Sequence, residues 1–398
     1  MRNTIIWSTL ALVLSFFSLA AVAQAPVLTL GDSSLRVYMG GRVKITSLFS
    51  QKRTFPSGTA YLLLPQDATG QESSYDINAR ASNLWFSFDG PRLGNMKLGG
   101  MMLFYFTASV ASEDYGVLPS LLYVDLSNEK WRFAVGQQVD VFASRVPEMV
   151  DNYFAMAVSG CAGNSSRGQV RAERFVELGG GRLTITAALS EPITNYISGD
   201  LKNNTTDAGV PNIEAAIRYE SAKDPESLLD HSKIELGVSA VNGTYRVFKN
   251  NANGTNIRVN KPKVKGIAGE YAFSLGSKFG VQGEVYTGQA LGNYLGAIFQ
   301  TTKGEFDKEI RSTGWWVEGA YHWRKGLQSR FGYGQDLCNE DDLDGSGILK
   351  NQTVFMNAIW DVSRLLQLSI EPTWRKTSYV VLKKNEGFGA MLAVTLRF

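Results

Sequence analysis

Apolar and polar residues alternate with a period of two along most of the chain. In the last segment, alternate positions from Phe388 to Phe398 carry Phe, Ala, Leu and Val, while the positions between them carry Gly, Met, Ala, Thr and Arg. Such alternation is typical of a β-strand whose two faces meet different surroundings. Sixteen segments follow the pattern and are predicted to be strands: 35–49, 82–88, 95–106, 120–126, 130–138, 167–176, 182–190, 211–220, 232–241, 263–273, 279–287, 313–323, 327–335, 352–361, 366–375 and 387–398.

The connections between these segments differ in length according to their parity. A long polar stretch follows each odd-numbered segment, whereas most even-numbered segments are followed by a few residues, 221–231 being the longer exception. An even number of strands with alternately long and short connections is the arrangement of an outer-membrane β-barrel. Because sixteen strands enclose a lumen too wide for side chains to fill, the apolar face must point outward. We therefore predict an all-β fold: an antiparallel up-and-down barrel that spans a membrane.

Aromatic residues occur where the lipid-facing band of such a barrel would end. Trp315 and Trp323 lie at outward positions near the two ends of one segment, and Trp360, Trp374 and Phe398 also lie outward at segment ends. Aromatic girdles border the apolar band of outer-membrane barrels, so outer-membrane lipid and lipopolysaccharide are predicted to surround the protein. A final strand that ends in an aromatic residue resembles the signal read by the barrel-assembly machinery, which is the second predicted partner.

The N-terminus resembles a secretory signal peptide. A short basic start, Met1-Arg2-Asn3, precedes an apolar run over 5–19 and small residues that end at Ala23. This order predicts cleavage after Ala23, leaving 24–398 as a single barrel domain exported to the cell outer membrane. No later stretch reaches the roughly 18 apolar residues of a transmembrane helix.

Composition narrows the classes of function. The chain has 40 Lys and Arg against 37 Asp and Glu, with no basic cluster, so nucleic acid is not an expected partner. Two cysteines and two histidines are too few for a disulfide framework or a His-rich metal site. No common catalytic or nucleotide-binding motif is present, so we expect neither an enzyme nor a bound cofactor or metal.

Three motifs carry a resemblance to a known family. Gly136-Gln137 ends the fifth segment, Pro147-Glu148 follows it, and Arg167-x-Gln169-x-Arg171 opens the sixth. These motifs resemble those of the DcaP-like porins, which are trimeric sixteen-stranded channels of Gram-negative outer membranes. The resemblance implies a homotrimer in which the connection 139–166 folds into the lumen and narrows it. The alternative is that this connection is an exposed surface loop.

Charged residues at inward positions suggest what the lumen carries. The first seven segments have mainly basic inward residues and the later segments mainly acidic ones. A transverse field favours small hydrophilic solutes, and guanidinium groups bind carboxylates. We therefore predict passive diffusion, with a preference for anions such as carboxylates, although the same charges could instead pair with one another. The predicted lining and constriction residues are Arg36, Arg42, Lys44, Lys97, Arg132, Asp140, Arg145, Glu148, Asp151, Arg167 and Arg171.

Several alternatives remain open at this point. The barrel could be a non-conducting structural or adhesion protein or, less in keeping with its histidines, a hydrolase. The acidic run 340–347 resembles a calcium loop, but its twelfth position is Asn351 instead of Glu, which favours an acidic external loop with at most weak divalent binding. Cys161 and Cys338 both fall in predicted external loops, so a disulfide between these loops is a further alternative.

Overall fold

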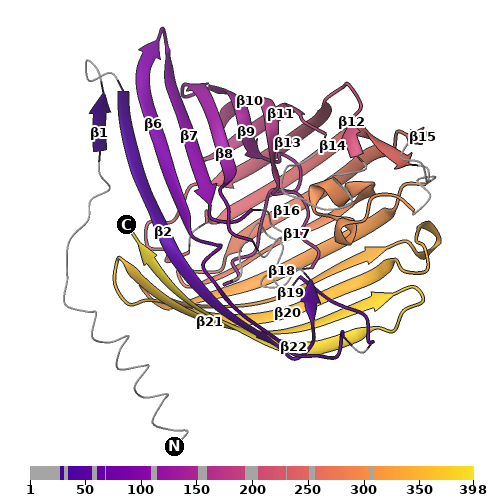
Figure 1. Cartoon of the computed structure of the whole chain (residues 1–398). Coiled ribbons are helices and arrows are strands. Elements are labelled where there is room, and N and C mark those ends of the chain that lie inside the picture. Colours follow the sequence, from indigo (N-terminus) through magenta and orange to yellow (C-terminus); the bar gives the residue numbers. More distant parts are fainter. Residues whose placement is uncertain are drawn as a thin grey trace, which may run out of the picture.

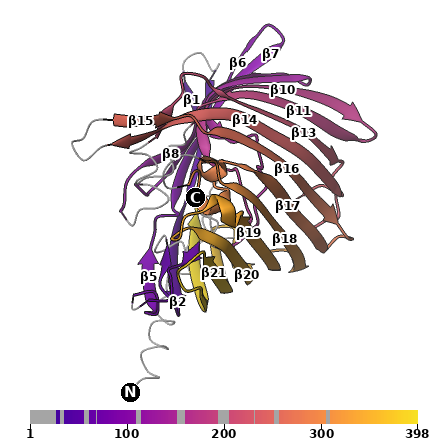
Figure 2. The ribbon, with the colours of Figure 1, turned by 90° about the vertical axis from the view of Figure 1, so that its right-hand side faces the viewer.

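The computed structural model describes residues 27–30, 35–55, 61–67, 69–108, 114–150, 159–192, 205–229, 231–250, 256–303 and 308–398. Sixteen antiparallel strands form a closed barrel, in which each strand pairs with the next along the chain (Figures 1 and 2). The barrel closes where β2 pairs with β22, with Arg42 opposite Arg397 and Ser50 opposite Gly389. The sixteen predicted segments are thus confirmed as β2(Leu35–Ser50), β6(Asn83–Leu93), β7(Met96–Tyr105), β8(Leu118–Ser127), β9(Trp131–Val139), β10(Ser166–Leu178), β11(Gly181–Ser190), β13(Asn212–Ser221), β14(Ile234–Asn250), β16(Lys263–Ser274), β17(Phe279–Gln289), β18(Arg311–Arg324), β19(Leu327–Cys338), β20(Ile348–Asp361), β21(Leu366–Tyr379) and β22(Asn385–Arg397).

Strand ends are where the alternation was least informative. Strand β14 continues to Asn250, past the predicted end at 241, through residues that are mostly polar. Backbone pairing continues beyond the apolar band because a hydrogen-bonded ladder needs no apolar face. The pattern did not predict β1(Val27–Leu30), which precedes β2 and pairs with it. It also missed short elements in the connections: β3(Thr54–Phe55), β4(Leu62–Leu63), β5(Ser74–Asn78), β12(Thr205–Asp207), β15(Asn256–Asn260) and the 3-10 helices η1(Leu291–Tyr294), η2(Ala297–Phe299) and η3(Glu340–Asp342).

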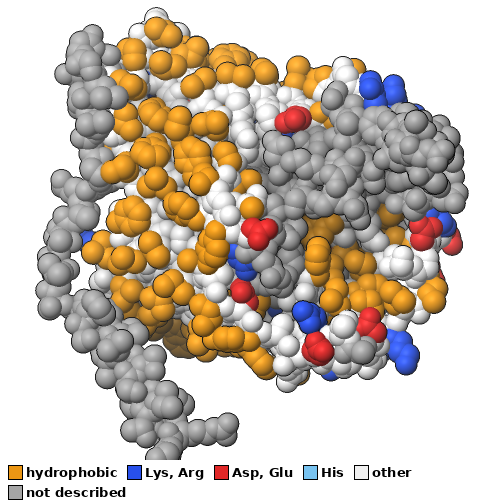
Figure 3. Space-filling model, in the orientation of Figure 1, with side chains coloured by type: hydrophobic (Ala, Val, Ile, Leu, Met, Phe, Trp, Pro, Cys, Tyr) orange, Lys and Arg blue, Asp and Glu red, His pale blue; other side chains and the backbone are white. Residues whose placement is uncertain are grey.

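The exterior of the barrel is apolar. Alternate residues such as Ile45, Val170 and Val238 are about half exposed, and Figure 3 shows hydrophobic side chains over most of the left part of the surface. Trp315, Trp323, Trp360 and Phe398 are all exposed, and Trp374 is partly so, as predicted for outward positions. Among the elements that the structure describes, no helix is long and apolar enough to cross a membrane. The polar and charged alternate positions point into the barrel.

Candidate functional site

The connection between β9 and β10 folds into the lumen, as predicted. Phe142 and Ala143 are fully buried, and Phe142 packs edge-on against Tyr294 with 5.7 Å between ring centroids. A Cβ at Gly266 of β16 would lie 2.8 Å from the Phe142 ring, so glycine makes room for it on the inner wall. Further along, Met149 and Cys161 pack with wall residues of β18 and β20. The loop therefore covers the inner faces of strands β13 to β21, which we call the covered wall.

Carboxylates on the covered wall hold the backbone of this loop. Glu214 accepts hydrogen bonds from the N–H groups of Val141 and Phe142, at 2.6 and 3.0 Å. Four others accept single loop N–H groups: Glu284 from Ala162 at 3.3 Å, Glu318 from Glu148 at 2.8 Å, Asp336 from Gly160 at 2.7 Å and Glu371 from Val150 at 2.7 Å. All five carboxylates are at most 1% exposed. They therefore position the loop through charge-assisted hydrogen bonds and do not line open lumen.

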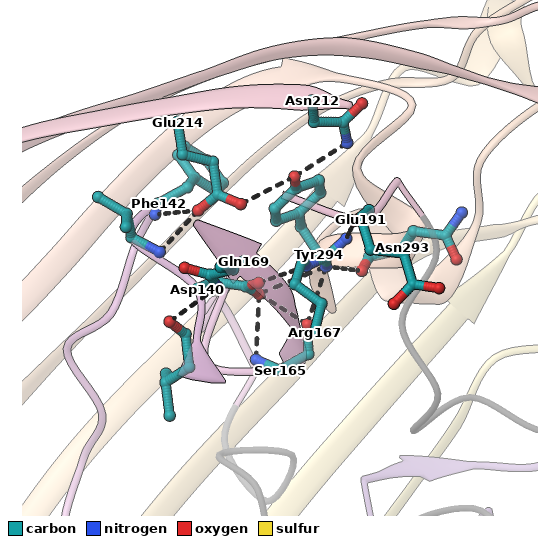
Figure 4. A network of polar contacts seen from close by, with 12 residues as sticks. Asp140, Phe142, Ser165, Arg167, Gln169, Glu191, Asn212, Glu214, Asn293 and Tyr294 are labelled. Atoms are coloured by element: carbon teal, nitrogen blue, oxygen red, sulfur yellow. Dashed lines mark hydrogen bonds and ion pairs between the residues drawn. The ribbon is translucent and has the colours of Figure 1, made fainter. Parts of the chain in front are cut away.

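A buried arginine joins the loop to a second inserted segment (Figure 4). The Arg167 guanidinium forms an ion pair with Asp140 and donates to the Asn293 carbonyl oxygen at 2.6 Å. Its central carbon lies 3.9 Å from the centroid of the Tyr294 ring, whose hydroxyl donates to Glu214 at 3.2 Å. Both Arg167 and Asp140 were predicted to line the pore, yet Arg167 is 0% exposed and Asp140 2%. They lie beneath the inserted segments, at the junction of β10, the loop and η1.

A third segment, from the connection between β2 and β6, also packs into the barrel. The Tyr61 hydroxyl donates to Asp336 at 2.8 Å, and the Tyr61 carbonyl accepts from the Asn351 amide at 3.0 Å. The Leu63 N–H donates to the Thr377 hydroxyl at 2.9 Å. Three connections that are distant in sequence thus fill the same side of the lumen.

Predicted lumen residues on the opposite side form ion pairs between neighbouring strands. Arg132 contacts both Asp125, at 3.2 Å, and Glu173, at 3.0 Å. Arg171 lies 3.7 Å from Glu173 and also donates to the Val139 carbonyl at the base of the loop. Acidic and basic groups therefore alternate along this side. Local pairing, the alternative left open by the sequence, describes these residues better than two opposed walls of unlike charge.

Most of the other residues predicted to line the pore are bound to neighbouring groups. Lys97 pairs with Asp89 at 2.8 Å and keeps a side-chain exposure of 45%, while Arg36 is exposed and Arg42 partly so. Lys44 is buried and donates to the Val150 carbonyl, Arg145 donates to Gln282 at 2.9 Å and pairs with Glu235, and Glu148 pairs with Arg330 at 2.7 Å. Asp151 lies outside the described residues. Most inward side chains of β6, β7 and β8 are only partly buried, and we call the inner faces of these strands the uncovered wall.

Sequence reasoning noticed the wall carboxylates but not their role. Glu214, Glu284, Glu318 and Glu371 are among the acidic inward residues that the pattern places on the later segments. Their contacts depend on where a loop about 70 to 220 positions away in sequence comes to rest. The only signal available in the sequence was the excess of acidic inward residues on the later strands.

The two cysteines do not form a disulfide. Both are free thiols, and each is buried in a different environment: Cys161 with Trp316 and Phe355, and Cys338 beside the Ala297 carbonyl at 3.4 Å. The bridged alternative is therefore not what the structure contains. Cys161 lies in the inserted loop and Cys338 at the end of β19, and noncovalent packing encloses each thiol.

The external acidic run binds basic side chains of its own chain. Asp342 contacts Arg311 at 2.6 Å and also pairs with Lys308. Burial alone would raise the pKa of Asp342, but hydrogen bonds from Arg311 and Lys308 outweigh it and lower this pKa to about 2. Within the described ranges, no group of three or more His, Cys, Asp or Glu side chains is placed to hold a metal ion.

Comparison with known proteins supports the fold. No family model and no curated protein sequence matches the chain. Among solved structures, the outer-membrane channel DcaP of Acinetobacter baumannii is similar with a TM-score of 0.70 at 17% identity, covering 92% of this chain and 99% of that one. The anion-selective porin of Comamonas acidovorans has a TM-score of 0.58 at 13% identity, covering 92% and 100%. Salmonella typhi OmpF, in complex with daunomycin, has a TM-score of 0.56 at 10% identity, covering 93% and 100%. At these identities the shared property is the porin fold, in agreement with the resemblance read from the sequence.

Proposed function

We propose that the protein is an outer-membrane porin through which small hydrophilic solutes diffuse passively. The observation that carries this proposal is a closed sixteen-stranded barrel with an apolar exterior, a charged interior and a loop fixed inside it. A barrel of this size leaves an aqueous path unless something plugs it, and an inserted loop sets its width. Export through a signal peptide ending at Ala23 and assembly as a homotrimer in lipid and lipopolysaccharide belong to the same proposal.

A preference for anions such as carboxylates follows from which charges stay accessible. Five carboxylates of the covered wall bind the loop, and each of these five is at most 1% exposed. On β2, by contrast, Arg36 is exposed and Arg42 partly so, and neither has an acidic partner within ion-pair distance among the described side chains. These two guanidinium groups therefore add positive potential to the accessible path, which lowers the barrier for anions. The anion-selective Comamonas porin shares this fold.

Reversal potentials in planar bilayers under a KCl gradient test the proposal. We expect the wild-type channel to pass chloride in preference to potassium, and the double variant Arg36→Gln/Arg42→Gln to shift the reversal potential toward cation selectivity. Arg174→Gln is the matched control, because Arg174 stacks on Trp131 at the outer surface and should leave selectivity unchanged. A wild-type protein that inserts without conducting would reject the porin assignment. A conducting but cation-selective protein would reject only the anion preference.

A further inference from the structure

The uncovered wall carries apolar side chains at inward positions. The Lys97–Asp89 and Arg132–Asp125 ion pairs show which face of β6, β7 and β8 points inward. Counting in steps of two from these residues, the inward positions pass Ser87 on β6 and Gly99 on β7 and then become apolar or aromatic, whereas on β8 they are so directly after Asp125. They form what we call the apolar strip: Trp85, Met101, Leu103, Leu121 and Tyr123.

The strip is continuous across the three strands. Trp85 is opposite Leu103, which is opposite Leu121, and in the next row Met101 is opposite Tyr123. The indole of Trp85 extends over Gly40 of β2, where a Cβ would lie only 2.5 Å from its ring. Glycine at this position therefore lets the indole lie against the backbone of β2, extending the strip toward a fourth strand.

Accessibility distinguishes this strip from the other apolar residues inside the barrel. Trp316, Phe355 and Phe142 are at most 1% exposed because inserted segments lie over them. The five side chains of the strip are only partly buried. Porin lumens are normally lined by polar residues, and leaving apolar area in water forgoes its burial free energy. A contiguous apolar patch that stays accessible in such a place points to a ligand.

Basic groups border the strip at both ends. Arg42 is two residues beyond Gly40, about 7 Å along β2 from the level of Trp85. At the other end, the Arg132 guanidinium lies 5.1 Å from the centroid of the Tyr123 ring. Lys97 is on β7, the strand next to that of Tyr123. A guanidinium has five N–H donors, so Arg132 can bind a further oxygen while keeping its carboxylate partners. The arrangement complements a solute with one anionic group and one apolar face.

We propose that the apolar strip is a binding site for small amphiphilic anions on their way through the channel. The apolar body of the solute lies against Trp85, Leu103 and Leu121, while its carboxylate contacts Arg42 or Arg132. This inference rests on the proposed porin function. It adds a second property by which the channel selects solutes, the apolar character of the anion, to the first property, its charge. Among anions of equal charge, those with an apolar body are retained longer than polyhydroxylated ones.

Blockade of the single-channel current tests the site directly. Cyclohexanecarboxylate and gluconate carry the same charge, but only the former has an apolar body. We expect cyclohexanecarboxylate to cause brief blockades at concentrations where gluconate causes none, and Trp85→Ala to raise its half-blocking concentration about tenfold, since it removes a large apolar contact. Leu121→Ser, which removes apolar area without touching the indole, should act in the same direction. Trp323→Ala is the matched control, because Trp323 is 56% exposed on the outer surface.

Each outcome decides one point. A wild-type channel that conducts but is blocked equally by both anions would overturn the site while leaving the porin function intact. Unchanged blockade in both Trp85→Ala and Leu121→Ser would do the same. If Trp85→Ala does not reach the folded, heat-modifiable form on a gel, Leu121→Ser decides. No conductance at all in the wild type would reject the porin function itself.

Discussion

The two sides of the lumen differ in how far inserted connections cover their inward side chains. Both are built from strands with the same alternation, and both place a tryptophan inward: Trp316 on β18 and Trp85 on β6. Trp316 is 1% exposed beneath the inserted loop, with Met149, Cys161 and Phe355 around it. Trp85 remains accessible. The difference shows that a strand decides which side chains enter the lumen, whereas the connections decide which of them water can reach.

Substitution of Arg167 should have the largest effect on how the lumen is covered, because this residue joins the loop to η1 at the edge of the covered wall. In Arg167→Met the Asp140 carboxylate stays buried without its partner, which should cost about 3–5 kcal/mol. We expect release of the loop, seen as new proteolytic cleavage within 139–166 and a larger, noisier single-channel conductance. Arg167→Lys keeps the charge and should lose less. Wild-type conductance and cleavage in Arg167→Met would show that the loop is held without this arginine.

The two tryptophans allow a direct comparison of stability. Trp316→Ala leaves a cavity beneath the loop and should lower the free energy of unfolding by about 3 kcal/mol, at the lower end for a buried aromatic residue. Trp85→Ala removes a side chain that is already partly solvated, so its cost should be well under half of that. Urea denaturation in lipid vesicles, followed by fluorescence of the remaining tryptophans, measures both. Equal losses would mean that Trp85 is covered as Trp316 is.

The wall carboxylates should have a smaller but distributed effect. Glu214→Gln keeps the shape of the side chain but weakens the acceptor for the Val141 and Phe142 N–H groups, and should cost about 1–2 kcal/mol. A lower midpoint of thermal unfolding and more frequent current flicker are expected. Glu220→Gln, at an exposed position of the same strand, is the control and should match the wild type. Identical flicker in both variants would argue against a positioning role for Glu214.

The smallest predicted effect concerns the external acidic run and pH. The pKa of Asp342 is lowered to about 2 in the folded protein, below its value of about 3.9 in an unfolded chain. Its ion pairs therefore stabilise the fold fully above pH 4, and this contribution of about 1 kcal/mol, reduced by solvent around Arg311, is lost as pH falls from 4 to 2. Pepsin digestion at pH 4, 3 and 2 should show rising cleavage near 336–351. Asp342→Asn should be cleaved similarly at all three values, and a parallel rise in the variant would contradict the assignment.

Much of the barrel could be predicted because its signals are local. The alternation over 387–398 is visible residue by residue, and it correctly placed the exposed face that includes Phe388 and Leu392. Strand number and the outward Trp315 and Trp323 followed from the same pattern, since the side-chain period of a strand is set by its own backbone.

The sequence did not predict which inward side chains are buried and which stay exposed. Arg36 and Arg167 look alike as inward basic residues in the sequence, yet one is exposed and the other completely buried. Their exposure differs because Arg167 contacts Asp140 of the inserted loop and Asn293 and Tyr294 of η1, and these segments cover it. The amino-acid sequence by itself determined the strands, their order and the two faces of the wall. Only the tertiary structure decided which inner side chains hold the loops and which face the lumen, because those contacts join segments far apart in the chain.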